Sequence, residues 1–370
     1  MKFYSPAIIA CCLHTALVAA AFPLSGLIPS RAPAGFINES LPAFATGIDQ
    51  LIKWDAHWYT HIAQHGYDAH SVVFFPAIIL CIKALTSLGL SYSAAGLTIS
   101  NIFGFLSFQI MYQTFKLDYS EQISRRALIA YAVMPTSFFI NSIYTESLFL
   151  FFSLSCVYQA RQKNWLKAGC FGACSALTRN LGVFLFFYLV YEYRQSVPHC
   201  SRCRRFTLPL FFPVGAVLAY MAFNHYIAGT PLAFLDSQKE WGRFFNSPLA
   251  NIYNNIILTL NGNPYIQPGA TLDTVSVCFA LAGLICSSCS SQFRIRGSYL
   301  LIGWLWLLVP LLSTSTWLPL YSISRFILVI FPLYLFWAQL RDRWYYGSLV
   351  VSAATLCICA ALFINWHWIG

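Results

Sequence analysis

Apolar runs long enough to cross a lipid bilayer recur from one end of this 370-residue chain to the other. A transmembrane helix needs about 20 apolar residues, and shorter runs are typical of half-height helices. Only 9% of the residues are charged, whereas a soluble domain carries about 25%. We therefore expect an all-α integral membrane protein with about nine to eleven membrane segments. The predicted segments are residues 7–28, 72–90, 94–115, 127–140, 147–159, 166–191, 208–227, 272–288, 299–312, 320–340 and 345–366.

The net charge of +10 comes from the connectors between these runs rather than from a nucleic-acid surface. Lys and Arg in short connectors hold them on the cytoplasmic side of a membrane, so nucleic acid is not an expected partner. The connectors carry Arg194, Arg202, Arg204 and Arg205; Arg294 and Arg296; and Arg341 and Arg343. Two large loops, residues 29–71 and 229–271, are then extracytoplasmic, and residues 1–370 form a single membrane domain.

The middle of the chain allows two arrangements. In the first, residues 72–115 make only one net crossing, which sends residues 142–147 and 178–182 to the outer side. The basic residues that this arrangement keeps on the cytoplasmic side are Arg125, Arg126, Arg161, Lys163 and Lys167. The alternative leaves several of them outside, against the usual distribution of positive charge.

The first loop carries the densest polar cluster, in the sequence KWDAHWYTHIAQHGYD from Lys53 to Asp68. Residues 56–67 can form a short amphipathic helix in the membrane interface, with Trp58, Ile62 and Tyr59 facing lipid. His57, His61 and His65 recur four residues apart and share one face of that helix. Such a stripe can chelate a metal, but no HExxH glutamate accompanies it, so a plain polar face is the favoured interpretation and no metal site is expected.

Asp55 precedes this helix, where a carboxylate can cap the backbone N–H groups or act as general base for a sugar hydroxyl. A phosphate leaving group then needs cations, not a strong acid. Arg325 and Arg179, at the outer edges of apolar runs, can supply them, although such an arginine can also reach for lipid phosphate. Glu146 lies between apolar runs, where an acid is functional or paired, and Arg179 is the candidate partner for pairing.

Three motifs that hold these residues resemble, in order, the signature of the GPI mannosyltransferase 2 (PIG-V) family and its bacterial relatives. The first combines Trp54-Asp55-Ala56, the segment IAQHGY at residues 62–67 and Phe74-Phe75-Pro76. The second is PTSFF followed by SIYTESLF within residues 135–149, and the third is ALTRNLG at residues 176–182. Weaker matches are GTPLAF at residues 229–234, Trp241-Gly242-Arg243 and Ser324-Arg325-Phe326.

The resemblance implies a GT-C-type helical bundle with short interfacial helices in its first loop. It implies an inverting enzyme that moves mannose or another hexose from a polyprenyl- or dolichyl-phosphate donor to a lipid-linked glycan acceptor on the extracytoplasmic face. Asp55 would be the catalytic carboxylate, with Arg325 and Arg179 on the donor phosphate. The expected substrate-binding residues are Trp54, His57, Trp58, His61, His65, Tyr67 and Glu146.

The same resemblance bears on the acceptor, the cofactors and the location. Lys53 replaces the arginine usual in eukaryotic members, which weakens the assignment of a GPI-type acceptor more than that of the chemistry. A lipid monophosphate donor does not require a divalent ion, so no cofactor is expected, with a divalent cation left open. The expected partners are the lipid-linked donor, a glycolipid acceptor and membrane lipids. The expected location is the bacterial cytoplasmic membrane, or the endoplasmic reticulum membrane in a eukaryote.

Two other classes of protein compete with a glycosyltransferase. A transporter should show two matching halves with broken helices, whereas no internal repeat stands out and the polar residues gather at one membrane face. A non-catalytic assembly subunit would keep its function without Asp55.

Overall fold

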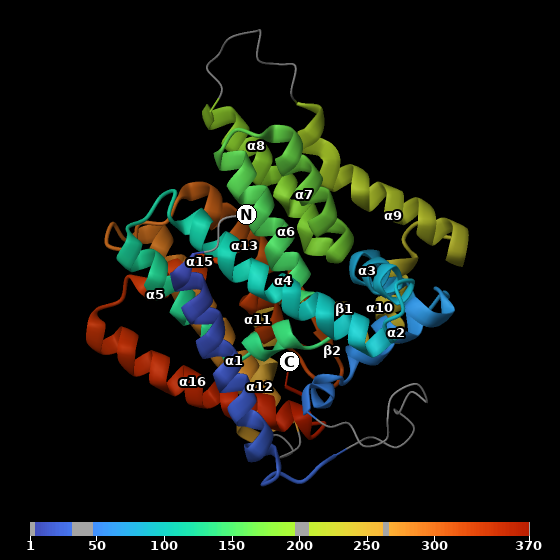
Figure 1. The fold of residues 1–370 in the computed structure, drawn as a ribbon, viewed down its shortest axis with the longest axis horizontal. Coiled ribbons are helices and arrows are strands. Elements are labelled where there is room, and N and C mark those ends of the chain that lie inside the picture. The colour runs from blue at the N-terminus through green and yellow to red at the C-terminus, as the bar shows by residue number, and fades with distance from the viewer. Residues whose placement is uncertain (1–3, 32–46, 197–206, 262–265, 370) are drawn as a thin grey trace.

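The computed structural model describes residues 4–31, 47–196, 207–261 and 266–369, which are almost entirely helical (Figure 1). The predicted cytoplasmic Arg202, Arg204 and Arg205 lie outside these ranges. The α-helices are α1 (Ser5–Ser25), α2 (Asp55–His65), α3 (Pro76–Thr86), α4 (Tyr92–Phe115), α5 (Glu121–Ala132), α6 (Glu146–Arg161), α7 (Trp165–Thr178), α8 (Leu185–Ser196), α9 (Phe212–Ala228), α10 (Ala233–Glu240), α11 (Pro248–Asn261), α12 (Gln267–Cys289), α13 (Gly297–Leu311), α14 (Ile323–Leu328), α15 (Pro332–Ala338) and α16 (Asp342–Ile364). Two short strands, β1 (Arg243–Phe245) and β2 (Ser313–Ser315), form an antiparallel ribbon.

Five of the described helical stretches are long and apolar enough to cross a membrane: α1, α4, Leu208–Ala228, α12 and α16. Two shorter apolar helices, α3 and α13, accompany them. Their backbone groups are paired within each helix, as a hydrocarbon environment demands. The expectation of an all-α, multi-pass membrane protein is confirmed.

Two predicted segments are wrong as single helices. Residues 166–191 divide into α7 and α8 because the backbone of Arg179 is extended, with φ −152° and ψ 146°. Gly182 then passes so close to α7 that a Cβ atom there would lie 2.4 Å from the backbone nitrogen of Ala176. Residues 320–340 divide into α14 and α15, with Pro332 at the start of α15. Hydropathy alone does not detect either break, since each one lies between two apolar runs.

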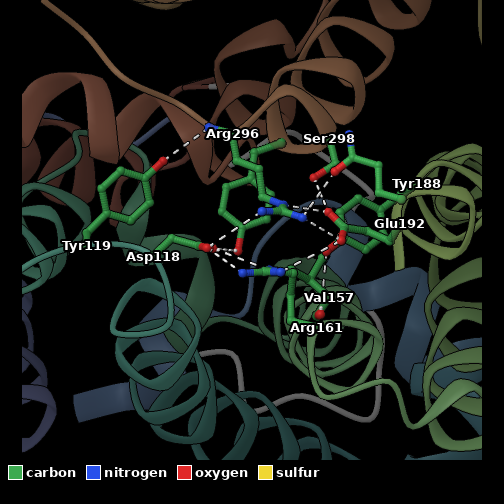
Figure 2. Close-up of polar contacts among 10 residues, drawn as sticks. Asp118, Tyr119, Val157, Arg161, Tyr188, Glu192, Arg296 and Ser298 are labelled. Atoms are coloured by element: carbon green, nitrogen blue, oxygen red, sulfur yellow. Dashed lines mark hydrogen bonds and ion pairs between the residues drawn. The ribbon is translucent and has the colours of Figure 1, made fainter. Parts of the chain in front are cut away.

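The basic connectors meet at one end of the bundle, where four charged residues from α6, α8, the α4–α5 connector and the residue before α13 form a cluster (Figure 2). Arg296 donates from Nε and Nη2 to the two carboxylate oxygens of Glu192, at 2.7 and 2.9 Å. Arg161 pairs with Asp118, which also accepts a 2.8 Å hydrogen bond from the hydroxyl of Tyr299. We call these four residues, Asp118, Arg161, Glu192 and Arg296, the four-charge cluster.

Glu146 and Arg161 occupy the first and last positions of α6, so at 1.5 Å per residue they lie about 22 Å apart along the helix axis. The four-charge cluster therefore lies at the opposite end of α6 from Glu146. Arg126 pairs with Asp342 at 2.9 Å, which joins α5 to the start of α16. These contacts keep the basic connectors together, as the first arrangement predicts, and the assignment of this end to the cytoplasm stays a prediction.

Replacing Glu192 with Gln is expected to lower stability without changing substrate affinity. The side chain is 4% exposed and receives hydrogen bonds from Arg296 and Ser298, and the loss of a buried charged acceptor costs about 1–3 kcal/mol. Thermal unfolding of the purified protein would measure the change. Glu121→Gln is the matched control, because Glu121 is 42% exposed and exposed ion pairs contribute at most about 1 kcal/mol. Equal melting temperatures for the two variants would contradict a structural role for the four-charge cluster.

Candidate active site

The second motif, residues 135–149, holds the first loop in place. The hydroxyl of Ser142 donates to the carbonyl of Leu51, and that of Tyr144 donates to the carbonyl of Lys53 at 3.2 Å. The same motif supports α14, since Thr136 Oγ1 donates to the carbonyl of Ser324 at 3.3 Å. These bonds bring together residues 91 to 188 positions apart in the chain. The first loop and α14 are therefore fixed to one scaffold.

On this scaffold, four charged side chains form a continuous network. Arg325 Nη1 donates to Asp55 Oδ2 at 3.0 Å, and Arg325 Nε donates to Glu146 Oε1 at 2.9 Å. Arg179 Nη1 lies 3.2 Å from the same Glu146 oxygen. The Arg325 guanidinium also lies over the ring of Tyr144, 4.4 Å from its centroid. We call Asp55, Glu146, Arg179 and Arg325 the charge network.

The contacts within the network bear on the alternatives raised for three of its members. Asp55 is the first residue of α2 and bonds to Arg325, while the N-cap position is Trp54, which makes no side-chain cap bond. Arg325 is 5% exposed and paired with two carboxylates, so it does not reach toward the phosphates of the surrounding membrane lipids. Glu146 is fully buried and pairs with Arg179, the candidate partner, as well as with Arg325.

A cavity of about 320 Å³ opens beside the charge network. Asp55, Arg179 and Arg325 line it together with residues of the second large loop and the β1–β2 ribbon. In Figure 1, α2, α3, α10 and the ribbon gather on the right, away from α5 and α15 on the left. The aromatic residues that line the cavity are Tyr59, Phe74, Phe75, Phe234, Trp241, Phe244, Phe245, Tyr321, Phe326 and Trp368. Aromatic faces beside a carboxylate suit a sugar, which stacks its C–H faces on rings and hydrogen-bonds through its hydroxyls.

Contacts between the two large loops close this cavity. Trp58 stacks on Phe74 with centroids 5.8 Å apart and meets the edge of Trp241 at 5.2 Å. The hydroxyl of Tyr67 donates to the carbonyl of Phe74 at 2.8 Å. Trp58 and Tyr67 thus support the wall residues Phe74 and Trp241 from behind. The expectation that Trp58, Ile62 and Tyr59 face lipid is wrong. Helix α2 packs on α3 and α4, Ile62 and Tyr59 are buried, and Trp58 is only partly exposed and meets Trp241 of the second loop.

The three histidines and Trp54 lie outside the cavity lining. His57 is buried and stacks on Trp366 at 5.5 Å, and Trp54 meets Trp366 and Trp368 at 5.5 and 5.1 Å. His61 and His65 are exposed, with ring centroids 4.6 Å apart. Within the described residues, no group of three His, Cys, Asp or Glu side chains is arranged to hold a metal ion. The histidine face of α2 thus packs on the C-terminal segment at one end and meets solvent at the other.

Acid is expected to destabilise the first loop through His57. Burial, with Lys53 nearby, lowers the pKa of His57 from 6.5 to about 4. Between these values the unfolded chain binds a proton that the folded chain does not, so stability falls as pH drops from 6.5 to about 4, by up to about 3 kcal/mol. Thermal unfolding across this range would show a shallower loss in His57→Gln. His61→Gln, exposed on the same helix, is the control and should retain the wild-type slope; identical profiles for all three proteins would contradict this origin.

Several residues that line the cavity or support its lining were not predicted from the sequence. Asp273 of α12 accepts the backbone N–H of Ser324 at 3.0 Å, so it holds the start of α14, where Ser322 has a left-handed φ of 60°. The sequence did carry a signal for Asp273, since an acidic residue inside an apolar helix is usually functional or paired. Arg243 was noted only as part of a weak motif, and Trp368, at the far end of the chain, carried no signal.

Comparison with known proteins identifies the family to which this chain belongs. A family model described as mannosyltransferase (PIG-V) matches residues 13–226, more than half of the chain. GPI alpha-1,6-mannosyltransferase 2 of Rattus norvegicus is 26% identical over 209 residues, which is 52% of this chain and 40% of the rat protein. The Mus musculus protein of the same name is 26% identical over 222 residues, 55% of this chain and 43% of its own length. The match thus spans less than half of these curated relatives.

The matched region contains Asp55, Glu146 and Arg179, while Arg243 and Arg325 lie beyond it. The helices, the order of the motifs and the family match agree with one another. The chain is a multi-pass membrane protein of the mannosyltransferase (PIG-V) family.

Proposed function

We propose that this protein is an inverting glycosyltransferase that moves mannose, or another hexose, from a polyprenyl- or dolichyl-phosphate donor to a lipid-linked glycan. The observation that carries the proposal is the cavity, where the partly exposed carboxylate of Asp55 faces aromatic walls and is fixed by the buried Arg325. The acceptor includes GPI-type glycolipids as one possibility, by analogy with the named relatives. The reaction takes place on the extracytoplasmic side.

Asp55 is the proposed general base. Its Oδ2 is held by Arg325, its side chain is 25% exposed, and its Oδ1 has no hydrogen-bond partner within the described residues. Oδ1 accepts the proton of the acceptor hydroxyl while that oxygen attacks the anomeric carbon. The new C–O bond forms as the bond to the phosphate oxygen breaks, and the leaving lipid phosphate takes the electron pair. A single displacement of this kind inverts the anomeric configuration.

The positive charge beside the cavity stabilises the departing phosphate. Arg325 and Arg179 supply part of it and line the cavity with Asp55. Glu146 holds both guanidinium groups from behind, so its proposed role is to orient them rather than to touch the sugar. A monophosphate leaving group needs no metal ion for this step.

Purified protein with polyprenyl-phosphate-mannose and a glycolipid acceptor would test the proposal. The expected product carries mannose with the anomeric configuration opposite to that of the donor. Transfer from a nucleotide sugar but not from the lipid phosphate would overturn the donor assignment. Retention of configuration would overturn the single displacement.

A further inference from the structure

A third arginine reaches the cavity and lacks the carboxylate partner that the other two have. Arg243 is the first residue of β1 and lines the cavity with Asp55, Arg179 and Arg325. Its guanidinium lies over the ring of Tyr321, 4.3 Å from the centroid, and Nη1 lies 3.4 Å from Gln238 Oε1. Among the described residues, no carboxylate lies within ion-pair distance of it.

The charges around the cavity do not balance. Four cations line the cavity, and one of them, Lys239, is paired with Asp236 on its own helix. Arg179, Arg243 and Arg325 contribute three further positive charges, and the charge network offsets two of these through Asp55 and Glu146. A charge withdrawn from water is costly unless it is paired, so the site is short of one anion next to Arg243. The planar guanidinium fork matches phosphate oxygens in geometry. Arg325 and Arg179 are already engaged by carboxylates, which leaves Arg243 as the cation best able to take a phosphate.

The strand that carries Arg243 continues into exposed apolar side chains. Phe244 and Phe245 are 48% and 80% exposed, and Trp317, just past the partner strand β2, is 74% exposed. The following helix, α11, contains no charged residue and turns its apolar side outward. Its exposed large side chains are Leu249, Tyr253, Ile256, Ile257 and Leu260. A cation that lines the cavity next to exposed apolar side chains matches an amphiphile with an anionic head and a hydrocarbon tail.

We propose that Arg243 is the principal anchor of the donor's phosphate and that the donor's polyprenyl chain leaves the cavity along Phe244 and Phe245. This inference rests on the proposed function and adds to it the residue that selects a lipid monophosphate. The phosphate of the donor sits between Arg243 and the charge network, with its sugar toward Asp55. Arg325 and Arg179 then act on the same phosphate at longer range, as the bond to the sugar breaks.

Direct binding to the purified protein tests this assignment without the reaction. The probes are polyprenyl monophosphate, the matching polyprenol and inorganic phosphate. Arg243→Gln is expected to bind polyprenyl monophosphate about 10- to 100-fold more weakly, the usual effect of losing a charge-assisted contact, with polyprenol binding unchanged. Arg243→Lys should recover part of the affinity. Arg294→Gln is the matched control, because Arg294 is exposed at the other end of the bundle and only its backbone N–H makes a described hydrogen bond.

Kinetics supply a second readout. Arg243→Gln should raise the donor KM by a similar factor while the acceptor KM stays within about twofold. Equal donor affinity in wild type and Arg243→Gln would overturn the anchor and leave the proposed function standing. Equal loss of polyprenol and polyprenyl phosphate would show a structural effect and also overturn it. If wild-type protein neither binds polyprenyl monophosphate nor transfers sugar from the polyprenyl-phosphate donor, both the proposed function and this site are overturned. Tight binding of inorganic phosphate alone would contradict a lipid donor.

Discussion

Asp55→Asn is expected to lower the rate of sugar transfer by about 10²- to 10⁴-fold, the contribution of a positioned general base. The amide keeps the size and shape of the carboxylate and can still accept a hydrogen bond from Arg325, but it takes no proton from the acceptor hydroxyl. The loss should therefore appear in kcat, with donor and acceptor KM values changed little. Steady-state assays with polyprenyl-phosphate-mannose measure all three constants.

Asp49→Asn is the matched control for this variant. Asp49 belongs to the same loop, in the short helix Gly47–Leu51, and does not line the cavity. Its replacement should leave turnover within about twofold, as is usual for a surface substitution. Undiminished turnover in Asp55→Asn would remove the base assignment. Thermal unfolding of both variants would separate a lost base from a lost fold.

The sequence identified the members of the charge network one at a time, because charged side chains are rare in this chain and each stands out against an apolar background. It predicted the pairing of Glu146 with Arg179, but not the contacts of Arg325 with Asp55 and Glu146. Arg325 and Asp55 are 270 positions apart in the chain, and nothing local links them. The structure joins them through Ser142, Tyr144 and Thr136, ordinary polar residues whose role depends on long-range hydrogen bonds.

The fold class followed from hydropathy, since a membrane helix can be identified from the composition of a window of residues alone. The breaks at Arg179 and before Pro332 were missed because a window averages over single residues. The lipid-facing assignment of α2 failed for a different reason. Its apolar side chains pack on α3 and α4, and Trp58 also meets Trp241, which lies more than 150 residues later. Arg243 was noted only within a weak motif, because an arginine in a loop is usually solvated, and only the packing of the ribbon places it in the cavity lining.

Glu146 is expected to be the most sensitive position for stability. Its carboxylate is fully buried and lies between the guanidinium groups of Arg325 and Arg179, at 2.9 and 3.2 Å. Glu146→Gln removes the negative charge and leaves two buried cations facing one another, which is expected to destabilise the protein by about 3–5 kcal/mol. Thermal unfolding would report this loss. Sugar transfer should fall as well, since Arg325 would no longer be held against Asp55 from behind.

A double variant distinguishes lost charge balance from lost packing. Glu146→Gln combined with Arg179→Gln removes one positive charge along with the negative one. The double variant should therefore lose less stability than the sum of the losses in the two single variants. Contacting charged residues commonly show such coupling, of about 0.5–3 kcal/mol. Simple additivity would mean that Glu146 and Arg179 act independently, against the 3.2 Å contact between them. Arg179 itself lines the cavity, so the turnover of the double variant is compared with that of Arg179→Gln alone. Lower turnover despite recovered stability would show that Glu146 orients Arg325 through its charge, and equal turnover would assign Glu146 a structural role alone.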